Sequence, residues 1–169
     1  FFKQKTAYEI KECDWSSDVC SSDLELARNE CIALCNDDIN FDPNIFGAIT
    51  ENTLMYSGIV GMGEGNYKDP IDEERGPYID MWKPGVNDWG WGCLILLKKS
   101  HWQPIPDEIK IWYGDNIIKD VNPVSKGCLR NFRIETEMST TSDEKEWDEV
   151  KKKDYEYFIN YLRYGKTTN

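Results

Sequence analysis

The feature that most constrains the fold is a short, uniformly apolar run that ends in a polar cluster. Cys31–Cys35 reads CIALC, and Asn36, Asp37 and Asp38 follow it directly. An apolar run without alternation is typical of a strand that is buried on both faces of an α/β sheet. Open α/β sheets bind their ligands outside the carboxyl ends of their strands. The sequence therefore predicts an α/β fold with a ligand site at residues 36–38.

A second apolar run has the same organisation. Cys93–Leu97 reads CLILL and predicts another buried strand, which follows the segment Trp89-Gly90-Trp91-Gly92. Further along, Ile109–Asn116 (IKIWYGDN) ends in a second acidic turn at Asp115, and we expect Asn116–Asp120 to open a helix. Two carboxylate-bearing turns after apolar segments are thus the main candidates for chemistry.

The other expected elements are read from local signals. Asp42-Pro43 is a helix-start signal, and Ile45, Phe46 and Ile49 would form the apolar side of that helix. Strands are expected over Met55–Val60 and Asn131–Thr136, and Gly61–Pro77 is expected to be a long exposed loop because it is rich in Gly, Pro and charge.

The most strongly patterned segment lies near the end of the chain. Asp143–Tyr164 predicts an amphipathic helix, with Gly165 as its C-cap. Its expected apolar side consists of Trp147, Val150, Tyr157, Tyr161 and Tyr164, with Phe158 and Leu162 beside them.

Composition excludes several classes of function. The chain has 20 basic and 31 acidic residues and a net charge of −11, which argues against a nucleic-acid groove. Cys31, Cys35, Cys93 and Cys128 form no CxxC pair, and His101 is the single histidine, so a zinc site is not expected. We expect free thiols in a cytoplasmic protein, with His101 in a structural turn and no membrane-spanning segment.

Residues 3–24 differ in kind from the rest. They show neither helical periodicity nor alternation, and Lys3–Ile10 (KQKTAYEI) and Asp14–Leu24 (DWSSDVCSSDL) resemble the two constant halves of a short-read sequencing adapter translated in one frame. We therefore expect residues 1–24 to be an artefact that packs poorly, and the natural chain to begin near Glu25 without its own N-terminus. In the natural protein we expect the strand Cys31–Cys35 to be central, with a neighbouring strand from the missing N-terminal part. Without that neighbour, one edge of the strand would be exposed in the present chain.

The two acidic turns allow two interpretations. Adjacent carboxylates repel one another unless a cation compensates, and a hard divalent cation bound through one or two carboxylates would bridge phosphate oxygens. Asn and Asp are also the usual residues of Asx-turns and helix caps, which need no ligand. Spacing alone leaves both interpretations open.

Four segments taken in order resemble the family-2-like glycosyltransferases with the GT-A fold, of the small type found in bacteriophage and bacteria. They are ECIALCNDDINF, WGWGCLILLKKSHW, IKIWYGDNIIKD and, more weakly, IETEMSTTS. The resemblance implies that residues 25–142 are the C-terminal part of such a domain, lacking its N-terminal nucleotide-binding half, and that residues 143–169 form a C-terminal helix and tail.

The resemblance also implies roles for individual residues. Asn36, Asp37 and Asp38 stand at the family's aspartate-x-aspartate motif, which holds the donor, and Asp38 matches the carboxylate that binds the metal, Mn²⁺ or Mg²⁺. Asn36 departs from the motif because it replaces its first acid. Asp115 falls at the general base of inverting members, and Asn116 stands where a second acid is often found.

The tryptophan-glycine segment has two interpretations. Trp89, Gly90, Trp91 and Gly92 would form the acceptor-side wall, because aromatic faces stack on sugars and glycine allows close backbone approach. Alternatively, both tryptophans belong to the core.

The expected function is inverting, metal-dependent transfer of a sugar from a nucleotide-sugar donor to an acceptor hydroxyl in the parent protein, the present chain being inactive without its base-binding half. The alternative is a non-catalytic sugar-binding or assembly module with a transferase-like fold. A nucleotidyltransferase would share the acidic site but would leave the tryptophan-glycine segment unexplained.

Overall fold

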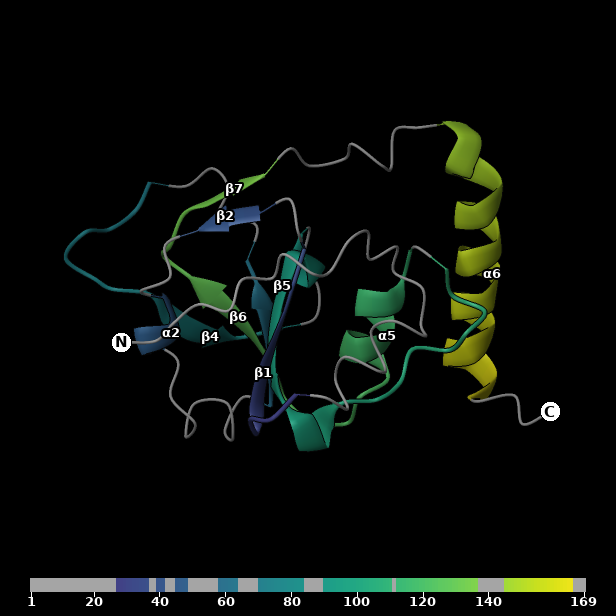
Figure 1. Ribbon diagram of the computed structural model, residues 1–169, viewed down its shortest axis with the longest axis horizontal. Coiled ribbons are helices and arrows are strands. Elements are labelled where there is room, and N and C mark those ends of the chain that lie inside the picture. Colours follow the sequence, from purple (N-terminus) through teal and green to yellow (C-terminus); the bar gives the residue numbers. More distant parts are fainter. Residues whose placement is uncertain are drawn as a thin grey trace.

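The centre of the molecule is a mixed five-stranded sheet (Figure 1). The structure, a computed structural model, describes residues 27–36, 39–41, 45–48, 58–63, 70–83, 90–110, 112–136 and 145–165. The strands are β1 (Cys31–Cys35), β3 (Ile59–Met62), β4 (Tyr78–Met81), β5 (Leu94–Lys98) and β6 (Lys126–Arg130), in the order β1-β5-β3-β6-β4. β3 and β6 are parallel, whereas the other neighbouring pairs are antiparallel. The predicted α/β class is confirmed at this level.

β1 is an edge strand. It pairs with β5 in the register Cys31 to Lys98, and among the described strands it has no second neighbour. Ile32 and Leu34 pack against the core, but Ala33 and Cys35 are exposed. The prediction that this strand is buried on both faces is therefore wrong, because the described elements leave Ala33 and Cys35 uncovered. The expected bare edge is confirmed for the described strands.

β5 is the strand that is buried on both faces. Ile95 and Leu97 belong to one hydrophobic cluster, whereas Leu94 and Leu96 belong to the other. Because successive side chains of a strand point to opposite faces, this alternation divides the core into two layers. The predicted strand at 93–97 is confirmed, except that Cys93 closes the preceding turn of helix.

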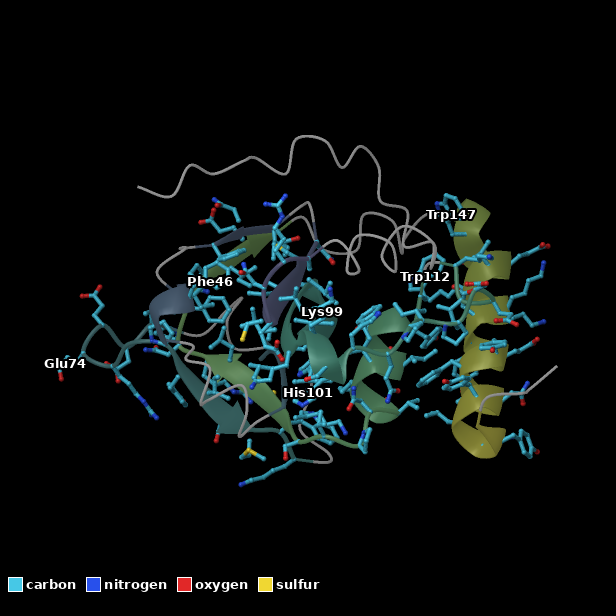
Figure 2. All side chains as sticks on the ribbon, turned by 60° about the horizontal axis from the view of Figure 1, so that its bottom comes forward. Phe46, Glu74, Lys99, His101, Trp112 and Trp147 are labelled. Atoms are coloured by element: carbon cyan, nitrogen blue, oxygen red, sulfur yellow. The ribbon has the colours of Figure 1, made fainter. Side chains whose placement is uncertain are left out.

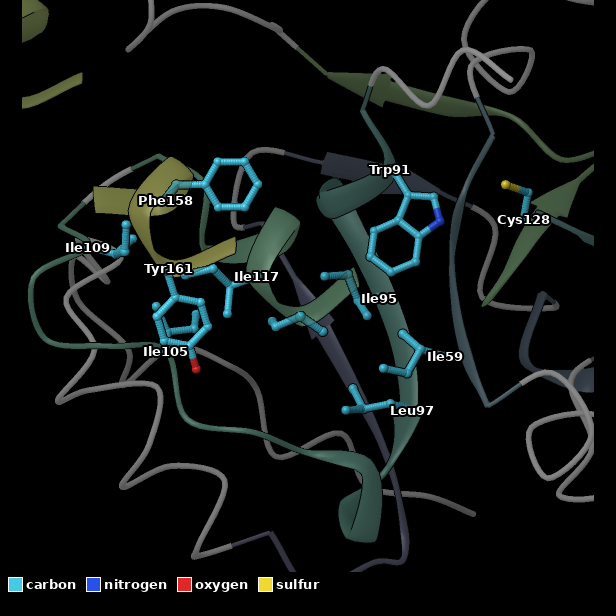
Figure 3. Packing of buried hydrophobic residues seen from close by; sticks show 11 residues of the cluster. Ile59, Trp91, Ile95, Leu97, Ile105, Ile109, Ile117, Cys128, Phe158 and Tyr161 are labelled. Carbon is cyan, nitrogen blue, oxygen red and sulfur yellow. The ribbon is translucent and has the colours of Figure 1, made fainter. Parts of the chain in front are cut away.

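Helices cover the face that carries Ile95 and Leu97. Residues of α5 (Gly114–Asp120) and α6 (Asp148–Tyr164) join this cluster, and Figure 3 shows Ile117, Phe158 and Tyr161 on the helical side. In Figure 1, α5 lies between the sheet and α6. The described residues also form three short 3₁₀ helices: η1 (Trp91–Cys93), η2 (Lys99–His101) and η3 (Lys145–Trp147).

The opposite face is covered by smaller elements. β2 (Ile39–Phe41) pairs antiparallel with β7 (Ile134–Thr136), and α2 (Ile45–Ala48) adds Ile45 to the second cluster. Phe46 was expected on the apolar side of this helix, but it is 46% exposed and contacts Phe41 edge-on at 6.0 Å. A helix of four residues presents one inward position, and Ile45 occupies it. Asp42, Pro43 and Ile49 lie outside the described residues.

One expected loop begins with a strand. Gly61 and Met62 were assigned to the loop 61–77, but both are buried in β3 and pair with β6. A glycine inside a strand marks a close approach, and a Cβ at Gly61 would lie 2.2 Å from the Trp91 indole. The later part of the segment is exposed as predicted, and Glu74 lies at the periphery in Figure 2.

The predicted C-terminal helix is confirmed, and Gly165 ends it with φ 71° while its N–H donates to Tyr161 O at 3.0 Å. The described buried residues of α6 are Asp154, Phe158 and Tyr161. Leu162 and Tyr164, expected on the apolar side, are 45% and 74% exposed. At 100° per residue they lie on either side of the buried line, and a tyrosine hydroxyl is readily solvated.

Candidate functional site

The carboxyl end of β1 is tied to η1. Asn36 N donates to Cys93 O at 3.0 Å, which continues the β1–β5 pairing by one further bond. Asn36 Oδ1 is buried and has no hydrogen-bond partner among the residues that the structure describes. A buried polar atom without a partner costs free energy, so this oxygen is suited to accept a ligand hydroxyl or to bind a hard cation. Asp37 and Asp38 lie outside the described residues.

The other side of η1 contacts Asp115. A Cβ built on Gly92 would lie 2.3 Å from Asp115 Oδ2 and 2.5 Å from Asp115 Cβ. Only a residue without a side chain leaves room for this carboxylate. η1 therefore joins the carboxyl end of β1 to the first turn of α5, and it brings two of the sequence-predicted site residues, Asn36 and Asp115, to the same end of the sheet.

The Asp115 carboxylate is held at the start of α5. The side chain is half-buried, and Oδ1 accepts a hydrogen bond from Asn116 N at 2.8 Å. The first N–H groups of a helix have no intrahelical partner, so this bond supplies one. Asp115 thus combines a fixed position with one oxygen directed at Gly92, which suits a base that must meet a substrate proton at close range.

The residue before α5 adopts an unusual backbone conformation. Tyr113 has φ 70°, in the left-handed region that side chains other than glycine seldom occupy. Its carbonyl nevertheless accepts the first bond of α5, from Ile117 N at 2.9 Å. Burial, and then the charges of Tyr155, Asp154 and Asp115, raise the pKa of the Tyr113 hydroxyl. The candidate base is therefore carried by a constrained turn.

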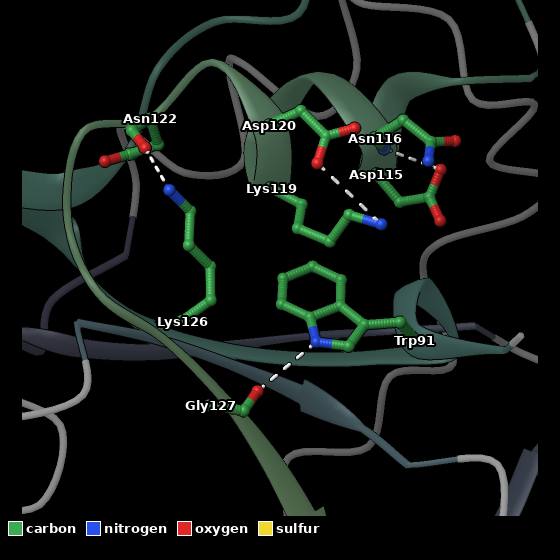
Figure 4. A network of polar contacts seen from close by, with 8 residues as sticks. All are labelled: Trp91, Asp115, Asn116, Lys119, Asp120, Asn122, Lys126 and Gly127. Atoms are coloured by element: carbon green, nitrogen blue, oxygen red, sulfur yellow. Dashed lines mark hydrogen bonds and ion pairs between the residues drawn. The ribbon is translucent and has the colours of Figure 1, made fainter. Parts of the chain in front are cut away.

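A buried lysine lies one helical turn after Asp115. Lys119 is 6% exposed, and its Nζ lies 5.9 Å from the centre of the Trp91 ring and 5.7 Å from that of Trp82. Nζ also lies 3.8 Å from Asp120 Oδ1. Figure 4 shows the ammonium above the Trp91 ring, on the side of the ring where Asp115 and Asp120 lie. An acid four residues before a lysine is the favourable order on a helix.

Trp91 itself is a core residue. It is 2% exposed, its indole N–H donates to Gly127 O at 3.2 Å, and Gly61 makes room for its ring. This burial favours the core interpretation of Trp91 over an acceptor-side wall, because a stacking platform must face solvent. Gly90 caps η1 with φ 76°, and Trp89 lies outside the described residues.

A polar network lies behind α5, and it includes His101. Asn122 is 3% exposed. Its side-chain amide donates to His101 O at 2.5 Å, and its backbone carbonyl accepts a bond from Lys126 Nζ (Figure 4). Burial lowers the pKa of Lys126, and the charge of Asp120 acts in the opposite direction. His101 Nδ1 lies 3.3 Å from Gly58 O, a contact that ties η2 to the start of β3. His101 therefore lies in a structural turn, as the sequence predicted.

Of residues 36–38, which were expected to bind the donor and a metal ion, the structure describes Asn36. Within the residues that the structure describes, no three His, Cys, Asp or Glu side chains gather as a metal group. Asn36 Oδ1, buried and unbonded, is the described atom that fits an oxygen-binding cation such as Mg²⁺ or Mn²⁺.

Lys119 and Asp154 were not singled out from the sequence. Lys119 stands four residues after Asp115 in a segment that was expected to be helical, and this spacing was the available signal. Asp154 lies four residues before Phe158, so a carboxylate interrupts an apolar stripe. Such a charge in a buried stripe indicates a specific hydrogen-bonding role.

Comparisons with family models, curated proteins and solved structures gave no match to this chain. No helix in the described part of the chain has the length and apolar character needed to cross a bilayer. The four cysteines that the structure describes are free thiols, of which Cys93 and Cys128 are buried and Cys35 is exposed.

Proposed function

We propose that the parent protein of residues 25–169 is a GT-A glycosyltransferase that transfers a sugar from a nucleotide-sugar donor to an acceptor hydroxyl with inversion. The observation that supports this most directly is the position of η1. It bonds to Asn36 on one side and contacts Asp115 on the other, so the first residue of the expected donor-binding motif and the candidate base lie at the same end of the sheet.

In the proposed reaction Asp115 is the general base. Its carboxylate accepts the proton of the acceptor hydroxyl while that oxygen forms a bond to the anomeric carbon, and the bond from this carbon to the donor diphosphate breaks. Proton, electron pair and leaving group are then all accounted for. The bond from Asn116 N to Oδ1 holds this carboxylate at the start of α5.

The donor side of the reaction falls to residues 36–38. Asn36 Oδ1 and the carboxylate of Asp38 would hold Mg²⁺ or Mn²⁺, which when bound neutralises charge on the diphosphate. Asn36 has the further task of binding a donor hydroxyl, for which its buried oxygen is already desolvated.

Two substitutions in the parent protein test the proposal. Asp115→Asn should leave metal-dependent binding of UDP-, GDP- or dTDP-sugars intact and slow transfer by about 10² to 10⁴, the scale of general-base loss. Asp38→Ala should abolish that metal-dependent binding. The matched control is Asp148→Asn, which removes an exposed carboxylate from α6.

The outcomes separate transfer from binding alone. Transfer by Asp115→Asn at the rate of the unsubstituted protein would show that Asp115 is only a turn residue. Sugar binding without transfer in the unsubstituted protein would favour the alternative, a non-catalytic binding module.

A further inference from the structure

Asp154 is a fully buried carboxylate on the C-terminal helix. It is 0% exposed, and it accepts hydrogen bonds from two backbone groups of the segment that precedes α5. Lys110 N lies 3.2 Å from each of its oxygens, and Trp112 N lies 2.9 Å from Oδ2. Burying a charged group is costly unless it is hydrogen-bonded, so these bonds explain why an acid is tolerated here. Both donors are within five residues of Asp115.

Three ring contacts attach the same segment to α6. The Tyr113 ring stacks on Phe158 with centroids 5.2 Å apart and an interplanar angle of 13°, and it lies 5.6 Å from the Tyr155 ring. Lys151 Nζ lies 5.6 Å from the centre of the Trp112 ring, which is beside α6 in Figure 2. The backbone N–H groups of Lys110 and Trp112 and the rings of Trp112 and Tyr113 are therefore held by one helix.

This attachment fixes a turn that would not persist alone. A tyrosine in the left-handed region is strained and is retained only where its surroundings impose that conformation. Tyr113 starts α5 through its bond to Ile117 N, and Asp115 follows two residues later. α6 therefore sets where the first turn of α5 begins, and with it the position of the Asp115 carboxylate.

We propose that Asp154 is a positioning residue for Asp115: by binding the N–H groups of Lys110 and Trp112 it holds the turn that aims the base. This inference deepens the proposed function and rests on it, because it assigns α6 to the reaction rather than to stability alone. Asp154 is fully buried, so it acts on the base through the turn.

Amide hydrogen exchange tests the geometry without any activity. Asp154→Asn keeps the size of the side chain but replaces one acceptor oxygen by an amide that faces the same N–H groups. Exchange should become at least about tenfold faster at Lys110 and Trp112 and also at Asn116, whose amide is bonded to Asp115 Oδ1. Asp148→Asn, an exposed acid on the same helix, should change none of the three. Unchanged exchange at Asn116 in Asp154→Asn would overturn the inference.

A double-mutant cycle tests the coupling to catalysis in the parent protein. Asp154→Asn should lower kcat about 10- to 100-fold with little change in donor KM, because a base displaced by about 1 Å loses alignment. In an Asp115→Asn background the same substitution should have almost no further effect on kcat. Equal loss in both backgrounds would show that Asp154 supports only the fold.

A second variant serves if Asp154→Asn does not fold. Phe158→Leu removes the ring that stacks on Tyr113, and the same exchange and double-mutant experiments are then made with it. The expected results and the results that would overturn the inference are the same. If the parent protein transfers no sugar, the proposed function fails, and exchange at Asn116 then decides separately whether α6 positions Asp115.

Discussion

Gly92→Ala is the most direct test of the contact between η1 and α5. The substitution adds one methyl group at a residue that is buried in η1. The new Cβ would lie 2.3 Å from Asp115 Oδ2, 2.5 Å from its Cβ and 2.7 Å from its Cγ, whereas ordinary contact begins at 3.4 Å. Because Asp115 Cβ is among these atoms, rotating the carboxylate does not relieve the clash, and the first turn of α5 must move by roughly 1 Å.

The structure sets the size of the effect. Inserting a methyl group into a packed site costs about 1–3 kcal/mol of unfolding free energy, which urea denaturation followed by tryptophan fluorescence measures. Movement of the carboxylate should also break its bond to Asn116 N, so the Asn116 amide should exchange faster with solvent. In the parent protein a shift of this size should slow transfer about 100-fold.

Gly76→Ala is the matched control. Its Cβ would meet no atom within 4 Å, and the residue is exposed, so the same chemical change should leave stability and Asn116 exchange unaltered. If Gly92→Ala behaves like Gly76→Ala in both measurements, the close approach of Gly92 to Asp115 does not exist, and the argument that η1 assembles the candidate site is refuted.

Two further predictions concern the turn and the core beside the site. Tyr113→Phe should reduce the loss of stability at alkaline pH. Burial raises the pKa of the Tyr113 hydroxyl above 10.0, so the unfolded chain releases this proton at a lower pH than the folded chain does. The folded state therefore loses stability as the pH rises above 10. Urea denaturation at about pH 9 and about pH 11 measures the difference, and an equal alkaline loss in both proteins would contradict it. Gly61→Ala should lower the free energy of unfolding by at least about 1–3 kcal/mol, because the new Cβ in this paired strand would lie 2.2 Å from the Trp91 indole. A loss as small as that of Gly76→Ala would show that the Trp91 ring does not pack against β3.

Local sequence determined the elements with strong internal signals. The uninterrupted apolar run at 94–97 gave a buried strand because both faces of β5 are covered, and periodicity with a terminal glycine gave α6 and its end at Gly165. The acidic turn at Asp115 could also be predicted, since Gly, Asp and Asn after an apolar segment are typical of turns and helix starts. The functional roles of Asn36, Asp37, Asp38, Trp89 and Asp115 stay predictions.

Tertiary structure decided what no local pattern encodes. Cys31–Cys35 is as apolar as β5, yet it lies at an edge, because burial depends on which strands and helices come to lie beside it. Trp91 became a core residue because Gly61, thirty residues earlier in sequence, leaves room for its ring. Asp154 became a hydrogen-bond acceptor for Lys110 and Trp112 for the same reason: the contact joins residues more than forty positions apart, and only the folded chain brings them together.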